Sequence, residues 1–311
     1  MAQITSAKRI ASFLPSATEI LYELGAGDQI VGVTHECDYP EEAKSKPRVI
    51  RSSFDHTKMN SKEIDNQISN LMQSGSDIYL LDEQVLKNSS PDLIIGQGIC
   101  DVCSPATKEI SKAISILNKK PEVVILDPHN LEDILSDILK IAKKVGKEEQ
   151  AQNLISSIQK RIEHVKTKSM TSRPKVLCIE WLDPLFTAGH WVPQMVEISG
   201  GINGISATGE RSRRMKLEEV IKFEPDIIVL MPCGFDINLI RKEYSKLASD
   251  LQWKLMTAVQ NNRVFAVDSN SYFSKPGPRT VTGIEILAKI IHPETFVDLK
   301  VPDDSYVQIN S

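Results

Sequence analysis

The sequence has few aromatic residues, no long apolar run and no excess of either charge. Aromatic residues make up 5% of the 311 positions, so a stacking platform for single-stranded nucleic acid is not expected. The 37 basic and 41 acidic residues give a net charge of −4, which provides no electrostatic footprint for nucleic acid or an anionic membrane. No run approaches the ~18 apolar residues of a membrane-spanning helix. The sequence therefore predicts neither a nucleic-acid partner nor a membrane span.

The cysteine count and the first residues both bear on the cellular compartment. Five cysteines, an odd number, fit a reducing compartment better than a disulfide framework. A secretory signal has a basic start, an apolar stretch of about 7–15 residues and a small-residue cleavage site. Polar residues interrupt the first 20 positions of this sequence, so that pattern is absent. We therefore expect a cytoplasmic protein.

Short apolar runs alternate with helical patterns along the chain, as is typical of parallel α/β sheets. A strand over 9–14, for example, leads into a helix that begins at Pro15 and ends near Gly25. Between residue 130 and about residue 168, apolar residues recur at spacings of three and four, and the other faces are charged. This spacing predicts a helical connector, with one continuous helix over much of 147–167.

The second half of the sequence repeats the first. The strand start Pro91-Asp92 matches Pro225-Asp226, and the apolar run 123–126 matches 264–267. The prediction is an α/β protein of two similar Rossmann-like lobes with parallel sheets. The lobes span 1–129 and 171–311, joined by the helical connector 130–170. Ligands of open α/β sheets bind beyond the carboxyl ends of the strands, so a ligand cleft is expected between the lobes.

Four of the five cysteines follow predicted strands: Cys37, Cys100, Cys103 and Cys233. Thiolates at a two-residue spacing, as in Cys100 and Cys103, suit zinc or an iron–sulfur cluster. The same pair could act as a redox dithiol. Alternatively, the four cysteines line a pocket as small apolar residues, because a free cysteine packs like one. The sequence leaves these alternatives open.

Two histidines and two tryptophans also follow predicted strands. His35 and His190 are candidate ligands for a bound molecule, or caps of their loops. Trp181 and Trp191 are suited to walling a large planar ligand, or to packing between lobes. The remaining histidines, His56, His129, His164 and His292, lie in helical or peripheral contexts and are not predicted to bind anything.

Enzymatic motifs are missing from the sequence. It has no G-x-S-x-G elbow, phosphate-binding loop, H-E-x-x-H pair or dinucleotide glycine fingerprint. A nucleophile built from a loop cysteine and His35 or His190 stays open, although nothing orders these residues into nucleophile, base and orienter. The sequence thus favours a binding protein over an enzyme.

One segment of the sequence resembles a known family. Residues 9–25, RIASFLPSATEILYELG, resemble the opening of helical-backbone substrate-binding proteins, the iron-siderophore and cobalamin binding components of ABC importers. The resemblance extends over about residues 8–293. Six further segments are similar to the cobalamin-binding branch: HECDYP (35–40), CDVC (100–103), EWLDPLF (180–186), GHWVP (189–193), PCGFD (232–236) and YFSKPGPR (272–279).

The resemblance implies a monomeric binder of a small molecule, namely a corrinoid such as cobalamin or a metal chelate. The residues expected to contact the ligand are Ser16, His35, Glu36, Asp38, Tyr39, Trp181, His190, Trp191, Phe235, Tyr272 and Phe273. Without an export signal or lipid-anchor cysteine, the sequence does not predict docking to an ABC permease. The alternative is a cytoplasmic metal or iron–sulfur protein, or an enzyme, that uses Cys37, Cys100, Cys103 and Cys233.

Overall fold

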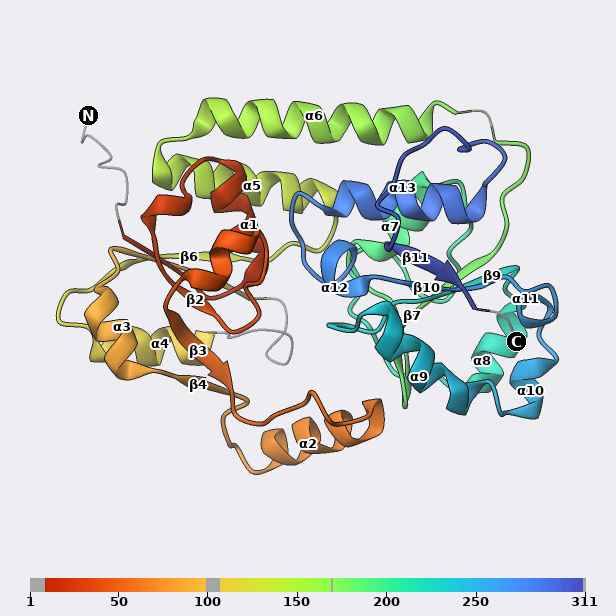
Figure 1. Cartoon of the computed structure of the whole chain (residues 1–311), viewed down its shortest axis with the longest axis horizontal. Coiled ribbons are helices and arrows are strands. Elements are labelled where there is room, and N and C mark those ends of the chain that lie inside the picture. Colours follow the sequence, from red (N-terminus) through yellow and green to blue (C-terminus); the bar gives the residue numbers. More distant parts are fainter. Residues whose placement is uncertain (1–8, 99–106, 169, 310–311) are drawn as a thin grey trace. The chain divides into compact units, whose positions relative to one another are not determined.

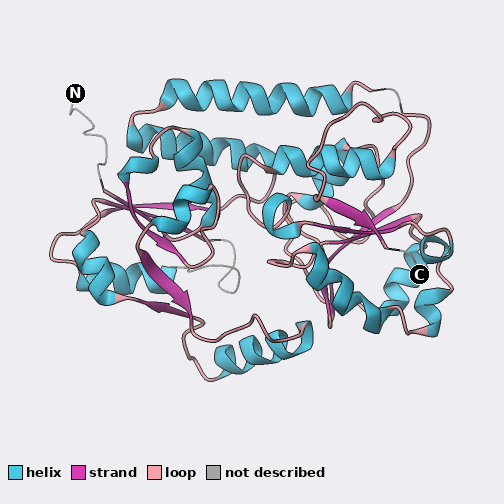
Figure 2. Cartoon of the chain, viewed as in Figure 1, coloured by secondary structure: helices cyan, strands magenta, loops and turns pink. Residues whose placement is uncertain are grey.

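The computed structural model describes residues 9–98, 107–168 and 170–309, and they form two compact units (Figures 1 and 2). Unit 1 holds the residues up to Met59 together with Asn66–Pro128 and Glu132–Ser157. Unit 2 holds Asn60–Asp65, His129–Leu131 and the residues from Ile158 onward. Each unit is therefore built from more than one stretch of the chain.

Unit 1 is organised around a six-stranded sheet with the order β4-β3-β2-β1-β5-β6. Its strands are β1 (Ile10–Ser12), β2 (Ile30–Thr34), β3 (Arg48–Ser52), β4 (Tyr79–Leu81), β5 (Leu93–Gln97) and β6 (Glu122–Leu126). The α-helices along this part of the chain are α1 (Pro15–Glu23), α2 (Ser61–Gln73), α3 (Glu83–Ser89), α4 (Thr107–Ile116) and α5 (Leu131–Val145). Two 3-10 helices, η1 (Gly27–Gln29) and η2 (Glu41–Ser45), flank β2.

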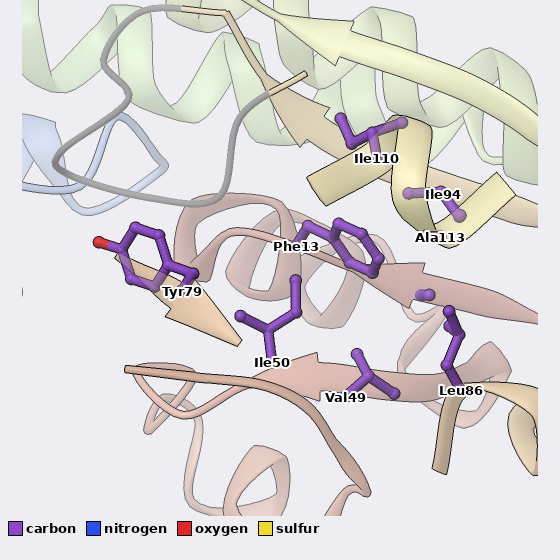
Figure 3. Packing of buried hydrophobic residues seen from close by; sticks show 9 residues of the cluster. Phe13, Val49, Ile50, Tyr79, Leu86, Ile94, Ile110 and Ala113 are labelled. Carbon is purple, nitrogen blue, oxygen red and sulfur yellow. The ribbon is translucent and has the colours of Figure 1, made fainter. Parts of the chain in front are cut away.

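The core of unit 1 is formed by apolar side chains from the strands and the helices that cover them (Figure 3). Phe13, Val49 and Ile94 are fully buried, and Leu86 and Ile110 pack into the same cluster from α3 and α4. Burial of this apolar surface is the main favourable term in folding. Because this packing holds the strands in place, the loops that follow their carboxyl ends begin at fixed positions.

Unit 2 is organised around a five-stranded sheet with the order β11-β10-β9-β7-β8. Its strands are β7 (Val176–Leu182), β8 (Leu185–Thr187), β9 (Ile227–Leu230), β10 (Val264–Val267) and β11 (Tyr306–Gln308). Helix α6 (Glu148–Lys166) belongs to unit 1 up to Ser157 and to unit 2 from Ile158. The later helices along this part of the chain are α7 (Val192–Ile198), α8 (Leu217–Phe223), α9 (Ile237–Leu247), α10 (Leu251–Lys254), α11 (Thr257–Gln260), α12 (Ser269–Tyr272) and α13 (Thr280–Ile291).

Equivalent strands of the two sheets pair with their neighbours in the same register. In unit 1, the backbone N–H of Asp92 donates to the carbonyl of Arg9 over 2.8 Å. In unit 2, the N–H of Asp226 donates to the carbonyl of Lys175 over 2.9 Å. Both aspartates follow a proline, which has no N–H of its own, so ladder pairing starts at the same point of each strand. The neighbours β1-β5-β6 thus correspond to β7-β9-β10, and the predicted repeat of two α/β lobes is confirmed.

Two details of the predicted fold need correction or refinement. The sheets are mixed rather than parallel, because β4, β8 and β11 pair antiparallel with their neighbours. These three strands have three residues each, too few to show a periodic pattern in the sequence. The predicted helix over 147–167 is confirmed as α6, and α5 precedes it as a separate helix that ends before Gly146.

None of the described helices combines the length and the apolar composition that crossing a membrane requires.

Candidate functional site

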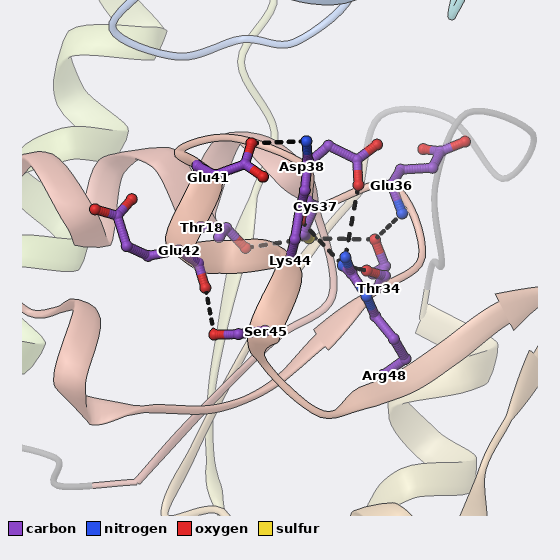
Figure 4. A network of polar contacts seen from close by, with 10 residues as sticks. All are labelled: Thr18, Thr34, Glu36, Cys37, Asp38, Glu41, Glu42, Lys44, Ser45 and Arg48. Atoms are coloured by element: carbon purple, nitrogen blue, oxygen red, sulfur yellow. Dashed lines mark hydrogen bonds and ion pairs between the residues drawn. The ribbon is translucent and has the colours of Figure 1, made fainter.

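The loop that follows β2 in unit 1 is held by a buried polar network around Cys37 (Figure 4). The Thr18 hydroxyl donates to Cys37 Sγ over 3.2 Å, and Thr34 Oγ1 lies 3.3 Å from the same sulfur. Arg48 Nη1 donates to the carbonyl oxygens of Thr34 and Cys37, over 2.5 and 3.0 Å. Cys37 is fully buried. Its thiol therefore positions the loop from inside unit 1.

His35 stands at the start of this loop and has a half-buried imidazole. Its ring centroid lies 6.0 Å from that of Tyr79, and Nε2 lies 3.8 Å from Glu36 Oε1. Burial, with a smaller contribution from His56, lowers the pKa of His35 below its usual 6.5. Neither ring nitrogen has a hydrogen-bond partner among the described residues. A neutral imidazole in this state can ligate a metal centre or accept a hydrogen bond.

The other predicted ligand residues of unit 1 differ in exposure. Ser16 lies in α1, is 1% exposed, and its hydroxyl has no partner in the described part of the chain. Asp38 Oδ1 lies 3.5 Å from Arg48 Nη2. Glu36 is half-buried, and Tyr39 is 41% exposed. These residues share one loop and the nearby end of α1, and their contact with a ligand stays a prediction.

Unit 2 brings two histidines and a tryptophan together. His190 adopts a left-handed backbone, with φ of 55°, and is 9% exposed. Its ring centroid lies 5.9 Å from that of His129 and 5.6 Å from that of Trp191. The backbone N–H of His190 donates to Glu210 over 2.6 Å, and Gly209 donates back to the His190 carbonyl over 2.9 Å. Paired backbone on both sides holds the imidazole in place.

Glu180, at the end of β7, joins two loops of this site. Its carboxylate accepts the N–H of Gly189 over 3.2 Å and the hydroxyl of Ser212 over 3.0 Å. Burial raises the pKa of Glu180, while these two hydrogen bonds lower it by less. A side chain at Gly189 would place Cβ 2.4 Å from the Ser212 nitrogen and 2.7 Å from the Glu210 oxygen. The close approach of the two loops therefore requires glycine.

The predicted aromatic walls of unit 2 are mostly interior. Trp191 is 6% exposed and donates through Nε1 to the Phe273 carbonyl over 3.0 Å; Phe273 is 2% exposed. Phe235 is 3% exposed, and its ring centroid lies 5.2 Å from that of Trp181. Trp181 and Tyr272 are half-buried, and the Arg279 guanidinium lies 5.7 Å from the Tyr272 ring centre. Of these five aromatic residues, Trp181 and Tyr272 are the two that are not fully buried, and the ligand role of all five stays a prediction.

His129 was predicted to bind nothing, yet its ring lies beside that of His190. This residue follows β6 through Asp127 and Pro128, so it lies at the carboxyl end of a strand, where the other candidates were sought. The rule that ligands bind beyond the carboxyl ends of the strands therefore points to His129 as well.

The cysteines do not assemble into a metal centre among the described residues. Cys100 and Cys103 lie outside those residues. Cys37 is buried in unit 1, and Cys233 is half-buried in unit 2. Where the chain is described, no group of three or more His, Cys, Asp or Glu side chains could hold a metal ion. Cys178 lies in the core of unit 2 on β7, and its burial raises the pKa of its thiol.

Comparison with known proteins gives the chain a family context. The model of the family described as periplasmic binding protein matches residues 10–271. The ABC transporter substrate-binding lipoprotein YvrC of Bacillus subtilis is 26% identical over 300 residues, covering 93% of this chain and 81% of the relative. The vitamin B12-binding protein of Vibrio cholerae is 23% identical over 286 residues, covering 90% of this chain and 87% of the relative.

A solved structure shows the same fold. The periplasmic heme binding protein of Pseudomonas aeruginosa superposes with a TM-score of 0.73 and 16% identity, covering 98% of this chain and 99% of that one. At this identity the likeness speaks for the fold alone. None of these comparisons supports zinc or an iron–sulfur cluster.

The prediction of a cytoplasmic protein is wrong. The matching family is that of periplasmic binding proteins, and the Bacillus subtilis relative is a lipoprotein. The prediction depended on the first 20 residues and on an odd number of cysteines, and neither determines the compartment in which this fold works.

Proposed function

Because the chain belongs to the periplasmic binding protein family, we propose that it captures a tetrapyrrole-type ligand, a corrinoid in the first place, outside the cytoplasm. The observation that carries the proposal is the similarity to the Vibrio cholerae vitamin B12-binding protein over 90% of this chain. The similarity to an ABC transporter substrate-binding lipoprotein supports delivery to an importer permease as the next step.

We propose that an aromatic group of unit 2 contacts the flat, metal-containing centre of this ligand. His129, His190 and Trp191 form one aromatic group whose rings lie 5.6–5.9 Å apart in neighbouring pairs. Aromatic faces contact planar rings favourably, and imidazole nitrogen is a good ligand for cobalt or iron. We propose that His190 is the main contact of this group, because its loop is fixed by Glu180 and Glu210.

In unit 1, we propose that His35 provides a second contact. Burial lowers the pKa of its imidazole, and the contact of Nε2 with Glu36 Oε1, at 3.8 Å, is longer than a hydrogen bond. A ligand atom that coordinates or donates to one of the ring nitrogens would restore the interaction that burial removed.

Heme is the second candidate ligand, and one observation favours it. Both proposed contacts are histidines, and imidazole is a common axial ligand of heme iron. A corrinoid that enters with its axial positions filled would use the same residues only for hydrogen bonds and apolar contact.

Titration of the purified protein with cyanocobalamin and with hemin, followed by absorption, distinguishes the two ligands. We expect saturable binding of at least one of them. His190→Asn and His35→Gln should each weaken that binding by about tenfold or more, roughly the 1.4 kcal/mol of one lost polar contact. His164→Gln is the matched control, because His164 is exposed on α6. Failure of both ligands to bind, or an equal effect of the control, would refute the proposal.

The proposed permease partner needs its own test. Cross-linking of the protein in its native cells, followed by mass spectrometry, should recover a permease subunit of an ABC importer. Recovery of only soluble proteins would argue against delivery to an importer.

A further inference from the structure

The segment Asn60–Asp65, which forms the start of α2, is bound by side chains of unit 2. The N–H and the hydroxyl of Ser61 both donate to Glu243 Oε2, over 3.0 and 2.8 Å. Ser61 is fully buried, and Glu243 on α9 is 4% exposed. The indole N–H of Trp181 donates to the Ser61 carbonyl over 3.2 Å. Ser61 thus uses its amide, its hydroxyl and its carbonyl to bind unit 2.

An ion pair holds the other end of the segment. Arg214 Nη2 lies 3.0 and 2.8 Å from the two carboxylate oxygens of Asp65. The Arg214 guanidinium also lies 5.7 Å from the centre of the Phe186 ring in β8. The side chains of Arg214 and Asp65 are 59% and 19% exposed. A pair this accessible is weak and is screened by salt.

Helix α2 can form without these contacts. Asn60 and Glu63 make a capping box, in which the Glu63 N–H donates to Asn60 Oδ1 over 3.1 Å and the Asn60 N–H donates to Glu63 Oε2 over 2.8 Å. Among the residues of α2, only Ser61 and Ile64 are buried, and both lie in the segment bound to unit 2. The segment is therefore a preformed element whose contacts with the side chains of Glu243, Trp181 and Arg214 are polar.

We propose that Asn60–Asp65 is a releasable clasp on unit 2. When bound, it engages the indole of Trp181 at the end of β7 and places the positive end of the α2 dipole against the Glu243 carboxylate. When released, it frees Trp181 and so gates ligand exchange at this unit. The gating step rests on the proposed function, whereas the clasp itself does not.

Hydrogen exchange measured by mass spectrometry, without any ligand, tests the clasp. Arg214→Gln and Ser61→Ala should each speed amide exchange in residues 61–66 severalfold and leave β7, β9 and β10 unchanged. High salt should have the same effect on the wild type, because it screens the ion pair. Arg213→Gln is the matched control, since the neighbouring Arg213 pairs with Glu219 instead. Unchanged exchange in 61–66 in both variants, or equally faster exchange throughout unit 2, would overturn the clasp.

Stopped-flow measurements with hemin and with cyanocobalamin test the gating. If the clasp is a gate, Arg214→Gln should raise the association and dissociation rate constants together, severalfold, with little change in the dissociation constant. Rate constants equal to those of Arg213→Gln would overturn the gate. Failure of both ligands to bind the wild type would overturn the proposed function and the gate together, while the exchange experiment decides the clasp independently.

Discussion

The imidazole rings of His129 and His190 lie 5.9 Å apart at 42°, although one follows β6 and the other follows β8. The segment His129–Leu131, which follows the unit 1 strand β6, therefore belongs to unit 2. Leu131 is fixed there by its N–H, which donates to the Gln194 side chain over 2.9 Å. The pairing of the two histidines therefore depends on backbone contacts on both sides.

Two substitutions of His190 should distinguish the contribution of its left-handed backbone conformation to stability from the contribution of its imidazole ring. A β-branched residue is strongly disfavoured at a positive φ, whereas asparagine tolerates it. We expect His190→Val to lower the free energy of unfolding by about 1–2 kcal/mol and His190→Asn to change it by less than about 0.5 kcal/mol. Urea denaturation measures both values. Equal destabilisation by the two variants would show that the ring, not the backbone, dominates at this position.

A methyl group at Gly189 should damage the His190 loop. In Gly189→Ala, Cβ would lie 2.4–2.8 Å from backbone atoms of Glu210, Arg211 and Ser212, which cannot move aside like a flexible side chain. Overpacking of this kind costs about 1–3 kcal/mol. Thermal unfolding should show the loss. The control is Gly98→Ala, where the nearest atoms lie at ordinary contact distances of 3.4–3.5 Å and little change is expected.

Loss of Arg161 should destabilise unit 2. Its guanidinium donates to both carboxylate oxygens of Glu285 and to Thr282 Oγ1, and the Glu285 side chain is only 9% exposed. Arg161→Met leaves this carboxylate without its cation and should cost about 1–3 kcal/mol in urea denaturation. Adding Glu285→Gln should recover part of the loss, because the second change removes the uncompensated charge. Additive losses in the double variant would contradict this explanation.

The lowered pKa of His35 predicts a specific pH dependence. The unfolded chain titrates at the ordinary value of 6.5, above the folded value, so it binds more protons in the window between the two. The free energy of unfolding should therefore rise with pH through this window, and the penalty should be largest below the folded pKa. His35→Gln should flatten that part of the curve. Urea denaturation at several pH values from about 5 to 8 measures it, with His164→Gln as control; an unchanged slope would exclude His35 as the cause.

Much of the fold could be predicted because its signals are local. Buried strands such as β9 and β10 are continuous apolar runs with turn residues on either side, and α6 shows helical spacing throughout. The edge strands β4, β8 and β11 could not be predicted in this way. Three residues give no period, and their pairing depends on neighbours distant in the sequence.

The candidate site was only partly predictable for a related physical reason. Position after a strand points to the loops of His35 and His190, which follow β2 and β8, but it does not tell which side chains turn inward. Trp191 and Phe273 turn into unit 2 because the indole N–H finds a backbone carbonyl there. The role of Glu180 and the binding of Ser61 to Glu243 depend on side chains that meet only in the folded chain.

The shared register of the two sheets gives each position of one unit a counterpart in the other. Ser12 pairs with Ile95 in β5, and Cys178 pairs with Val229 in β9, so Ser12 and Cys178 occupy the same place in their sheets. One is a hydroxyl that donates to the Leu14 carbonyl, and the other is a buried thiol. The two halves are copies in their backbone pairing but not in their side chains. The same strand pairing thus accommodates a hydroxyl in one half and a thiol in the other, so the side chain at this position can change without altering the pairing that supports both sheets.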